Sequence, residues 1–291
     1  MMQILDSNVL LAQVAERLPA KLRQHVVVIG SIATAWQFRD ISGTASVATK
    51  DIDLLLRPAV DAVTTAVALG EQMLDAGWTP QFPHGRARGT AQMRDDELPA
   101  LRLAPPNDDR GWMVELLGAP PVGQTERKRW RRFETSQGLF ALPSFRYMPV
   151  AVFDAMPSPS GLRVARPACM ALAHLLEHGE PDETPISGLP GEPPRFVKDV
   201  GRAVALWWLA NRRQKDPLAE WRRLWNQSLG SIFGDDEEEQ RSRARDGWCA
   251  LDGYLRDAHR IAAASVLAPH GVTLESYTHA WNAMEDLLRV R

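Results

Sequence analysis

The chain has 291 residues, 45% of them hydrophobic, which is enough material for one large domain or two smaller ones with real cores. Its 34 lysine and arginine residues nearly balance 36 acidic residues, so the net charge of -2 excludes a general electrostatic attraction to nucleic acids or acidic membranes. The two cysteines lack a metal-ligand spacing and no apolar stretch is long enough to span a membrane, so we expect a soluble, cytoplasmic protein without structural zinc.

The N-terminal part of the chain alternates between helical and strand-like patterns. Residues 5–24 place apolar side chains on one helical stripe, and the run HVVVIG that follows is typical of a buried strand. A short helix over SIATAWQFRD and a loop over ISGTASVATK lead to a second buried strand, DIDLLL. The order is therefore strand, helix, loop, strand.

The pattern changes along the rest of the chain. Residues 58–77 predict an amphipathic helix closed by Gly77, GWMVELL predicts a strand, and VGQTERKRWRRFE predicts a basic surface helix. From Pro167 onward the periodicity is helical, with a tryptophan supply that we interpret mainly as packing core. We expect an α+β fold, with a mixed sheet and flanking helices over residues 1–165 and a helical domain over residues 166–291.

Two aspartates open the strand DIDLLL. Side chains at positions i and i+2 of a strand project from the same face, so Asp51 and Asp53 present two carboxylates together. Mg²⁺ prefers oxygen ligands and commonly takes one or two carboxylates plus substrate phosphates. In isolation, an Asp-x-Asp pair more often marks the solvated start of a strand, so the metal interpretation depends on its surroundings.

A glycine and a serine stand at the turn from the first strand into its helix. Gly30 and Ser31 place backbone N–H groups and a small hydroxyl where a triphosphate can approach, because no bulky side chain intervenes. Taken alone, the pair more often marks a tight strand-to-helix turn with Ser31 as helix cap. The Asp-x-Asp strand that follows favours the phosphate interpretation.

A third acid, Glu115, stands among apolar residues in the strand WMVELL. A carboxylate in such a setting is costly unless it is solvated, paired or bound to metal. If this strand lies beside DIDLLL, three carboxylates converge, as metal-assisted phosphoryl transfer requires. The alternative is a solvated glutamate on an edge strand.

The three motifs VVVIGSIATAW, ATKDIDLLL and WMVELLGAP occur in the order typical of one superfamily. The chain resembles the DNA polymerase β-type minimal nucleotidyltransferases, and more narrowly the bacterial proteins related to AbiEii/MenA-type abortive-infection and toxin–antitoxin enzymes. The resemblance implies that Asp51, Asp53 and Glu115 are catalytic and bind Mg²⁺ or Mn²⁺. It also implies that Gly30 and Ser31 bind the nucleotide.

The resemblance extends more weakly into the helical region, where HLLEHG precedes PRFVKDVGRAVAL. By similarity with the Lys-Asp motif of the family, Lys198 and Asp199 are expected to contact the nucleotide. This segment departs from the family in its proline- and glycine-rich insertion and in carrying Arg195 where the family has a lysine-rich turn.

Two other features carry weaker signals. The basic run ERKRWRR, with Trp130, could track a nucleic acid backbone, but a solvated surface is the simpler interpretation. His174 and His178 are one helical turn apart, a spacing that can bind metal, but no third ligand is evident, and we interpret them as packing or surface residues.

The leading hypothesis is a metal-dependent enzyme that transfers NMP from an NTP to a hydroxyl group on RNA, protein or a small molecule, as a toxin or defence component. One alternative is a catalytically inactive binding module with the same fold. Another is a helical scaffold in which the DID motif is merely structural.

Overall fold

The structure is a computed structural model that describes residues 5–41, 43–44, 46–47, 51–82, 88–108, 110–121, 123–186, 191–214 and 216–289. The chain divides into two compact units. We call the first the sheet unit (Met1–Ala33, Ala48–Pro149 and Ala155–Ala165) and the second the helical unit (Thr34–Val47, Val150–Asp154 and Arg166–Arg291).

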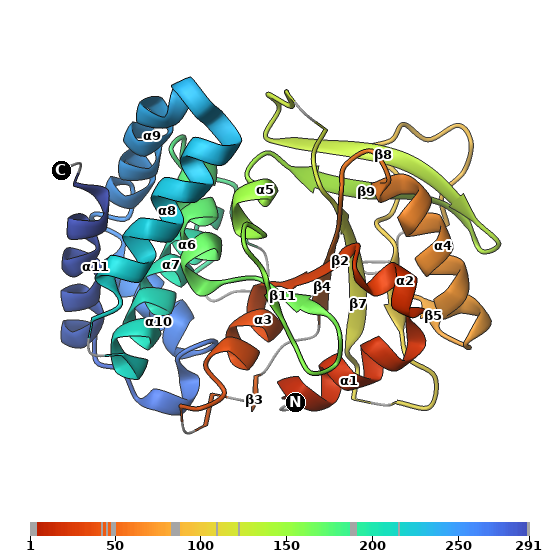
Figure 1. The fold of residues 1–291 in the computed structure, drawn as a ribbon, viewed down its shortest axis with the longest axis horizontal. Coiled ribbons are helices and arrows are strands. Elements are labelled where there is room, and N and C mark those ends of the chain that lie inside the picture. Colours follow the sequence, from red (N-terminus) through yellow and green to blue (C-terminus); the bar gives the residue numbers. More distant parts are fainter. Residues whose placement is uncertain are drawn as a thin grey trace. The chain divides into compact units, whose positions relative to one another are not determined.

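The elements of the two units follow one another along the chain (Figure 1). Those of the sheet unit are β1 (Leu5–Asp6), α1 (Ser7–Arg17), α2 (Ala20–Arg23), β2 (Val26–Ile29), β4 (Asp51–Leu56), α4 (Ala62–Asp75), β5 (Thr79–Pro80), β6 (Arg102–Ala104), β7 (Met113–Gly118), β8 (Lys128–Thr135), β9 (Gly138–Phe145), β10 (Met156–Pro157) and β11 (Arg163–Val164). Those of the helical unit are β3 (Ser46–Val47), α6 (Pro167–Glu177), α7 (Arg195–Arg213), α8 (Leu218–Phe233), α9 (Glu237–Cys249), α10 (Leu255–Ala263) and α11 (Leu274–Leu288), with short 3-10 turns at Gly234–Asp236 and Ala268–His270. The helices α3 (Gly30–Gln37) and α5 (Met148–Ala151) each have residues in both units.

The sheet unit is built on a seven-stranded mixed sheet in the order β10-β11-β2-β4-β7-β6-β5. Strand β4 runs antiparallel to β2 and parallel to β7, and β6 runs antiparallel to β7. The expected mixed sheet and C-terminal helical region are both confirmed at this level of the fold.

Burial explains why the central strands form. All four residues of β2 are buried, and β4 and β7 share one pattern in which the first and third residues are half-buried and the others are buried. Continuous apolar runs of this kind are typical of strands covered on both faces. The half-buried positions of β4 are those of Asp51 and Asp53, and Glu115 has the matching position in β7.

The prediction of a basic helix over residues 122–134 was wrong, because residues 128–134 lie in β8, which pairs antiparallel with β9. Residue 122 lies outside the described residues. The side chains of β8 alternate with a period of two, as in a strand. Phe133 and Thr135 are buried, and Arg131 donates hydrogen bonds to the backbone oxygens of Ala59 and Ala119. The density of charge suggested a solvated helix, whereas part of that charge serves to hold backbone carbonyls.

The core of the helical unit is rich in tryptophan, as expected. The rings of Trp207 and Trp221 meet edge to face with centroids 5.0 Å apart, and Trp225 donates from its indole nitrogen to the oxygen of Ala168 at 2.8 Å. All three tryptophans are buried.

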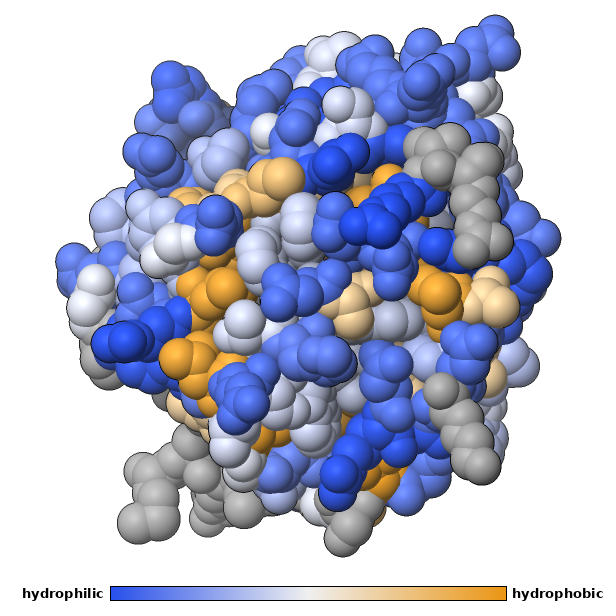
Figure 2. All heavy atoms as spheres, turned by 90° about the vertical axis from the view of Figure 1, so that its left-hand side faces the viewer, coloured by the Kyte–Doolittle hydropathy of each residue, from blue (hydrophilic) through white to orange (hydrophobic). Residues whose placement is uncertain are grey.

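None of the helices in the described part of the chain is both long enough and apolar enough to cross a membrane. The face seen in Figure 2 carries mostly hydrophilic side chains, with apolar ones in small patches between them.

A buried hydroxyl ties α11 to α7 in this core. Tyr277 is fully buried and donates a 2.7 Å hydrogen bond to the oxygen of Gly201. We expect Tyr277→Phe to lower the free energy of unfolding by about 1–2 kcal/mol, because it leaves a buried carbonyl without this donor. Both effects are measured by urea unfolding. Tyr254, which is 41% exposed, offers the matched control, and Tyr254→Phe should change the free energy of unfolding by less than about 0.5 kcal/mol. Equal losses in both variants would contradict this assignment.

Candidate active site

The structure brings the three predicted acids to neighbouring positions of the sheet. Asp51 and Asp53 open β4, and in the parallel pairing of β4 with β7 Asp53 lies directly beside Glu115. Because residues paired across adjacent strands project from the same face, all three carboxylates belong to one face of the sheet. Strand β7 therefore lies beside β4, as the convergence of the three carboxylates requires.

Gly30 lies against the carboxylate of Asp53. The antiparallel pairing of β2 with β4 sets Ile29 opposite Asp53, and Gly30 follows with φ of +73°, in the left-handed region that favours glycine. A Cβ atom added to Gly30 would stand 2.4 Å from Oδ2 of Asp53. Since α3 begins at Gly30, the positive end of its helix dipole also lies beside this acid.

This close approach predicts that Gly30 tolerates no side chain. We expect Gly30→Ala to lower the free energy of unfolding by about 2–4 kcal/mol, since backbone strain and a clash with Asp53 add together. Gly111 is a matched control, because it has φ of +74° but nothing within 4 Å of an added Cβ. Gly111→Ala should therefore show the strain alone, about 1–2 kcal/mol in urea unfolding. A loss at Gly30 no larger than at Gly111 would show that the contact with Asp53 does not matter.

An arginine that the sequence interpretation missed holds the third acid. Arg102 of β6 lies opposite Glu115 in the sheet, and its Nε and Nη2 atoms are both 2.9 Å from Oε2 of Glu115. Burial raises the pKa of Glu115; the Arg102 guanidinium opposes this shift and the charge of Asp51 adds to it, so the net direction is upward. Glu115 is thus a half-buried acid that releases its proton less readily than a solvated glutamate.

The ion pair predicts a pH-dependent effect of Arg102→Gln. Because the pKa of Glu115 is raised in the folded state, protonated Glu115 stabilises the fold at acidic pH, and this contribution is lost as the pH rises through that pKa. Removing Arg102 raises the pKa of Glu115 further. We expect Arg102→Gln to cost about 1–3 kcal/mol in urea unfolding near pH 8, because it strands a buried charge, and clearly less near pH 4.5.

Two controls separate this effect from a general loss of packing. In the double variant Arg102→Gln/Glu115→Gln, the additional loss of unfolding free energy near pH 8 should disappear, because no unpaired carboxylate remains. Arg94→Gln, which breaks the exposed ion pair with Asp96, should cost less than about 0.5 kcal/mol at either pH. An equal cost of Arg102→Gln at both pH values would contradict the assignment.

The donor chemistry at the start of β4 fits Mg²⁺. Asp51 and Asp53 supply two oxygen donors on one face, and substrate phosphates and water commonly complete the coordination of this ion. Within the described ranges, no group of three or more His, Cys, Asp or Glu side chains is arranged to hold a metal. Oε2 of Glu115 is engaged by Arg102.

Lys198 and Asp199 belong to the helical unit, where both lie in the first turns of α7. Asp199 has a partner in that unit, since its Oδ2 is 3.2 Å from Nε2 of His178 at the end of α6. Burial raises the pKa of Asp199, but the hydrogen bond with His178 and the proximity of His174 outweigh it and hold the pKa well below its usual range. The carboxylate therefore stays ionised inside the helix pair.

His174, half-buried in α6, and His178, the buried residue that follows α6, both belong to this cluster. His178 has no exposed surface, and burial lowers the pKa of His174 to about 4 although Asp199 opposes that shift. The interpretation of His178 as a packing residue is confirmed. The sequence did not show that Asp199, more than twenty residues away, completes the cluster.

No protein-family model matches the chain, and neither a curated protein nor a solved structure matches it.

Proposed function

We propose that the protein is a Mg²⁺-dependent nucleotidyltransferase that moves NMP from an NTP to a hydroxyl acceptor. The proposal depends above all on one observation, the parallel register that sets Asp53 beside Glu115 at the point where Gly30 approaches Asp53. Two neighbouring strands and a strand-to-helix turn thus combine acids with a phosphate-accessible backbone. The likeness of the three motifs to the polymerase β-type superfamily supports the same conclusion.

In the proposed reaction the acceptor oxygen attacks the α-phosphorus, a new O–P bond forms, and the bond to the bridging oxygen breaks to release pyrophosphate. The acceptor proton passes to a carboxylate, and Glu115 suits this role because it lies beside Asp53 on the same face of the sheet. Bound Mg²⁺ supplies charge neutralisation at the phosphates and acidifies the attacking hydroxyl. For Glu115 to act as the base, Arg102 must release its carboxylate.

The other residues have positioning roles in this proposal. The backbone at Gly30 and Ser31, at the start of α3, binds the triphosphate. For Lys198, in the helical unit, the resemblance alone implies a contact with nucleotide phosphate. Asp199 contributes to nucleotide binding through the start of α7, which it anchors to His178. The acceptor is a hydroxyl group of RNA, protein or a small molecule, and a role as a toxin or defence component follows from the resemblance.

Removal of either aspartate charge tests the proposal. We expect Asp51→Asn and Asp53→Asn each to lower transfer of label from α-³²P-NTPs to lysate RNA or protein by at least about 100-fold, because the charge that holds the cation is lost. Asp61→Asn is the matched control, since Asp61 is exposed at the start of α4 and makes no capping hydrogen bond, and it should retain full transfer. Transfer that survives both substitutions would exclude the proposed site.

A second candidate is a catalytically inactive binding or interaction module with the same fold. The contact that favours it is the Arg102–Glu115 ion pair, which occupies the acid expected to complete the site. The two candidates differ in one result, because the inactive module transfers no label under any condition.

A further inference from the structure

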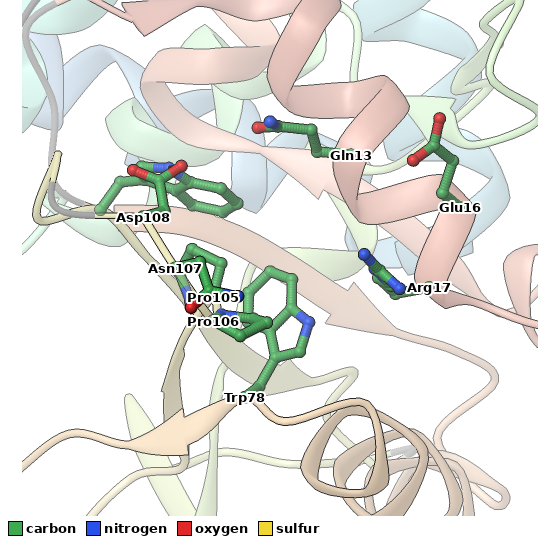
Figure 3. Close-up of a pocket in the computed structure, with 9 residues that line it drawn as sticks. Gln13, Glu16, Arg17, Trp78, Pro105, Pro106, Asn107 and Asp108 are labelled. Carbon is green, nitrogen blue, oxygen red and sulfur yellow. The ribbon is translucent and has the colours of Figure 1, made fainter.

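A second site lies in the sheet unit, in a hollow of about 190 Å³ between α1 and the loops before β5 and β7 (Figure 3). Its walls combine the flat apolar side chains of tryptophans and prolines with a larger number of polar and charged ones, so an occupant must offer both an apolar and a polar part. The lining residues are Gln13, Glu16, Arg17, Trp78, Pro105, Pro106, Asn107, Asp108 and Trp112.

The chain positions Trp78 in this hollow through the end of α4. Gly77 has φ of +86°, which turns the chain sharply after the helix, and the backbone N–H of Trp78 donates to the oxygen of Met73 at 3.0 Å. The ring of Trp78 then meets that of Trp112 edge to face, with centroids 5.5 Å apart. Both tryptophans are at least 96% buried, so the floor of the hollow is rigid and aromatic.

Trp112 shows how this region satisfies an indole N–H. Its Nε1 donates to Oδ2 of Asp108 at 2.9 Å, and the guanidinium of Arg110 binds the same carboxylate, through Nε to Oδ1 at 2.8 Å and through Nη2. The hydrogen bonds with Arg110 lower the pKa of Asp108 to about 2, despite partial burial, so this carboxylate is ionised and its charge is compensated. An indole and a guanidinium therefore share one carboxylate here.

Trp78 has the same pair of donors without the carboxylate. Its Nε1 is buried and has no hydrogen-bond partner among the described residues, which is costly for a buried donor. Figure 3 shows the nitrogen-bearing edge of Trp78 turned toward the guanidinium of Arg17, which is an exposed side chain on α1 and can move aside. The buried N–H of Trp78 lacks an acceptor, and an anionic oxygen placed between it and Arg17 satisfies both donors.

We propose that this hollow binds a small carboxylate joined to a flat apolar group, with a carboxylate oxygen between Trp78 Nε1 and Arg17. The apolar group packs on the aromatic floor and on Pro105 and Pro106. A cavity of about 150 Å³ accommodates a benzene ring, so the volume here suits one ring with its carboxylate. The site is independent of the acids of β4 and of the nucleotidyl transfer proposed for them.

Benzoate and N-acetyl-phenylalanine are suitable probes, since the first represents a free aromatic acid and the second the C-terminal residue of a polypeptide. We expect saturable binding of at least one of them, with a downfield shift of the Trp78 indole N–H in ¹⁵N-correlated NMR spectra. The corresponding amides, benzamide and N-acetyl-phenylalaninamide, should bind at least about tenfold more weakly, because they lack the charge that both donors recognise.

Substitutions at the two donors test the arrangement. Trp78→Phe keeps most of the ring but removes the N–H, and we expect it to weaken binding of the acid by about tenfold. Arg17→Gln should weaken binding by about threefold to tenfold, with less effect at high salt, because Arg17 is exposed. Lys21→Gln, at an exposed cation of α2 outside the lining, is the matched control and should leave the affinity unchanged.

Glu16 tests the sign of the charge that the hollow accepts. Glu16→Gln removes a carboxylate from the lining, so it should leave the affinity for the acid unchanged or raise it. The proposal is overturned by any of three results: no saturation by either acid up to about 10 mM, affinities that Trp78→Phe and Arg17→Gln do not alter, or tighter binding of benzylammonium than of benzoate. Repeating the titration with Asp53→Asn separates this site from the acid site, because its affinity should not change.

Discussion

The register between β2, β4 and β7 is the constraint on which the candidate active site depends. The pairing of β4 with β7 sets Asp53 beside Glu115, and the pairing of β2 with β4 brings Gly30 to the same acid. A slip of one residue in either ladder would turn one set of carboxylates to the opposite face of the sheet. The buried apolar residues that follow the acids in β4 and β7 prevent such a slip, so the packing of the core and the position of the acids have one cause.

In the proposed enzyme, the acid face is also the place where stability and activity conflict. Glu115 is largely buried, and Arg102 compensates its charge within the sheet. A compensated pair is tolerated in a core, but the same contact keeps the carboxylate away from a cation or a proton. In the proposed enzyme, a change of partner at Glu115 therefore accompanies the loading of nucleotide. In an inactive binding module, the ion pair is simply permanent.

Much of this arrangement was predictable from local patterns. The buried runs VVVI and DIDLLL predict central strands, and the run WMVELL predicts the strand that carries Glu115. The contact with Arg102 was not predictable, because it depends on the antiparallel return of β6, which is only three residues long. The basic run over β8 was misjudged, since its charge obscured the period of two that buries Phe133. The hollow at Trp78 was not predictable, because it depends on the geometry of the loops before β5 and β7, for which the sequence contains no motif.

The central claim is that the acids of β4 and the start of α3 form one cation site, and Mn²⁺ tests it directly. Paramagnetic Mn²⁺ added to ¹⁵N-labelled protein broadens the amide signals of residues near the bound ion. If the claim is right, substoichiometric Mn²⁺ broadens the signals of Gly30, Ser31 and Glu115 first, and the effect is lost in Asp53→Asn. Broadening that leaves Gly30 and Glu115 unaffected, or that persists unchanged in Asp53→Asn, would contradict it.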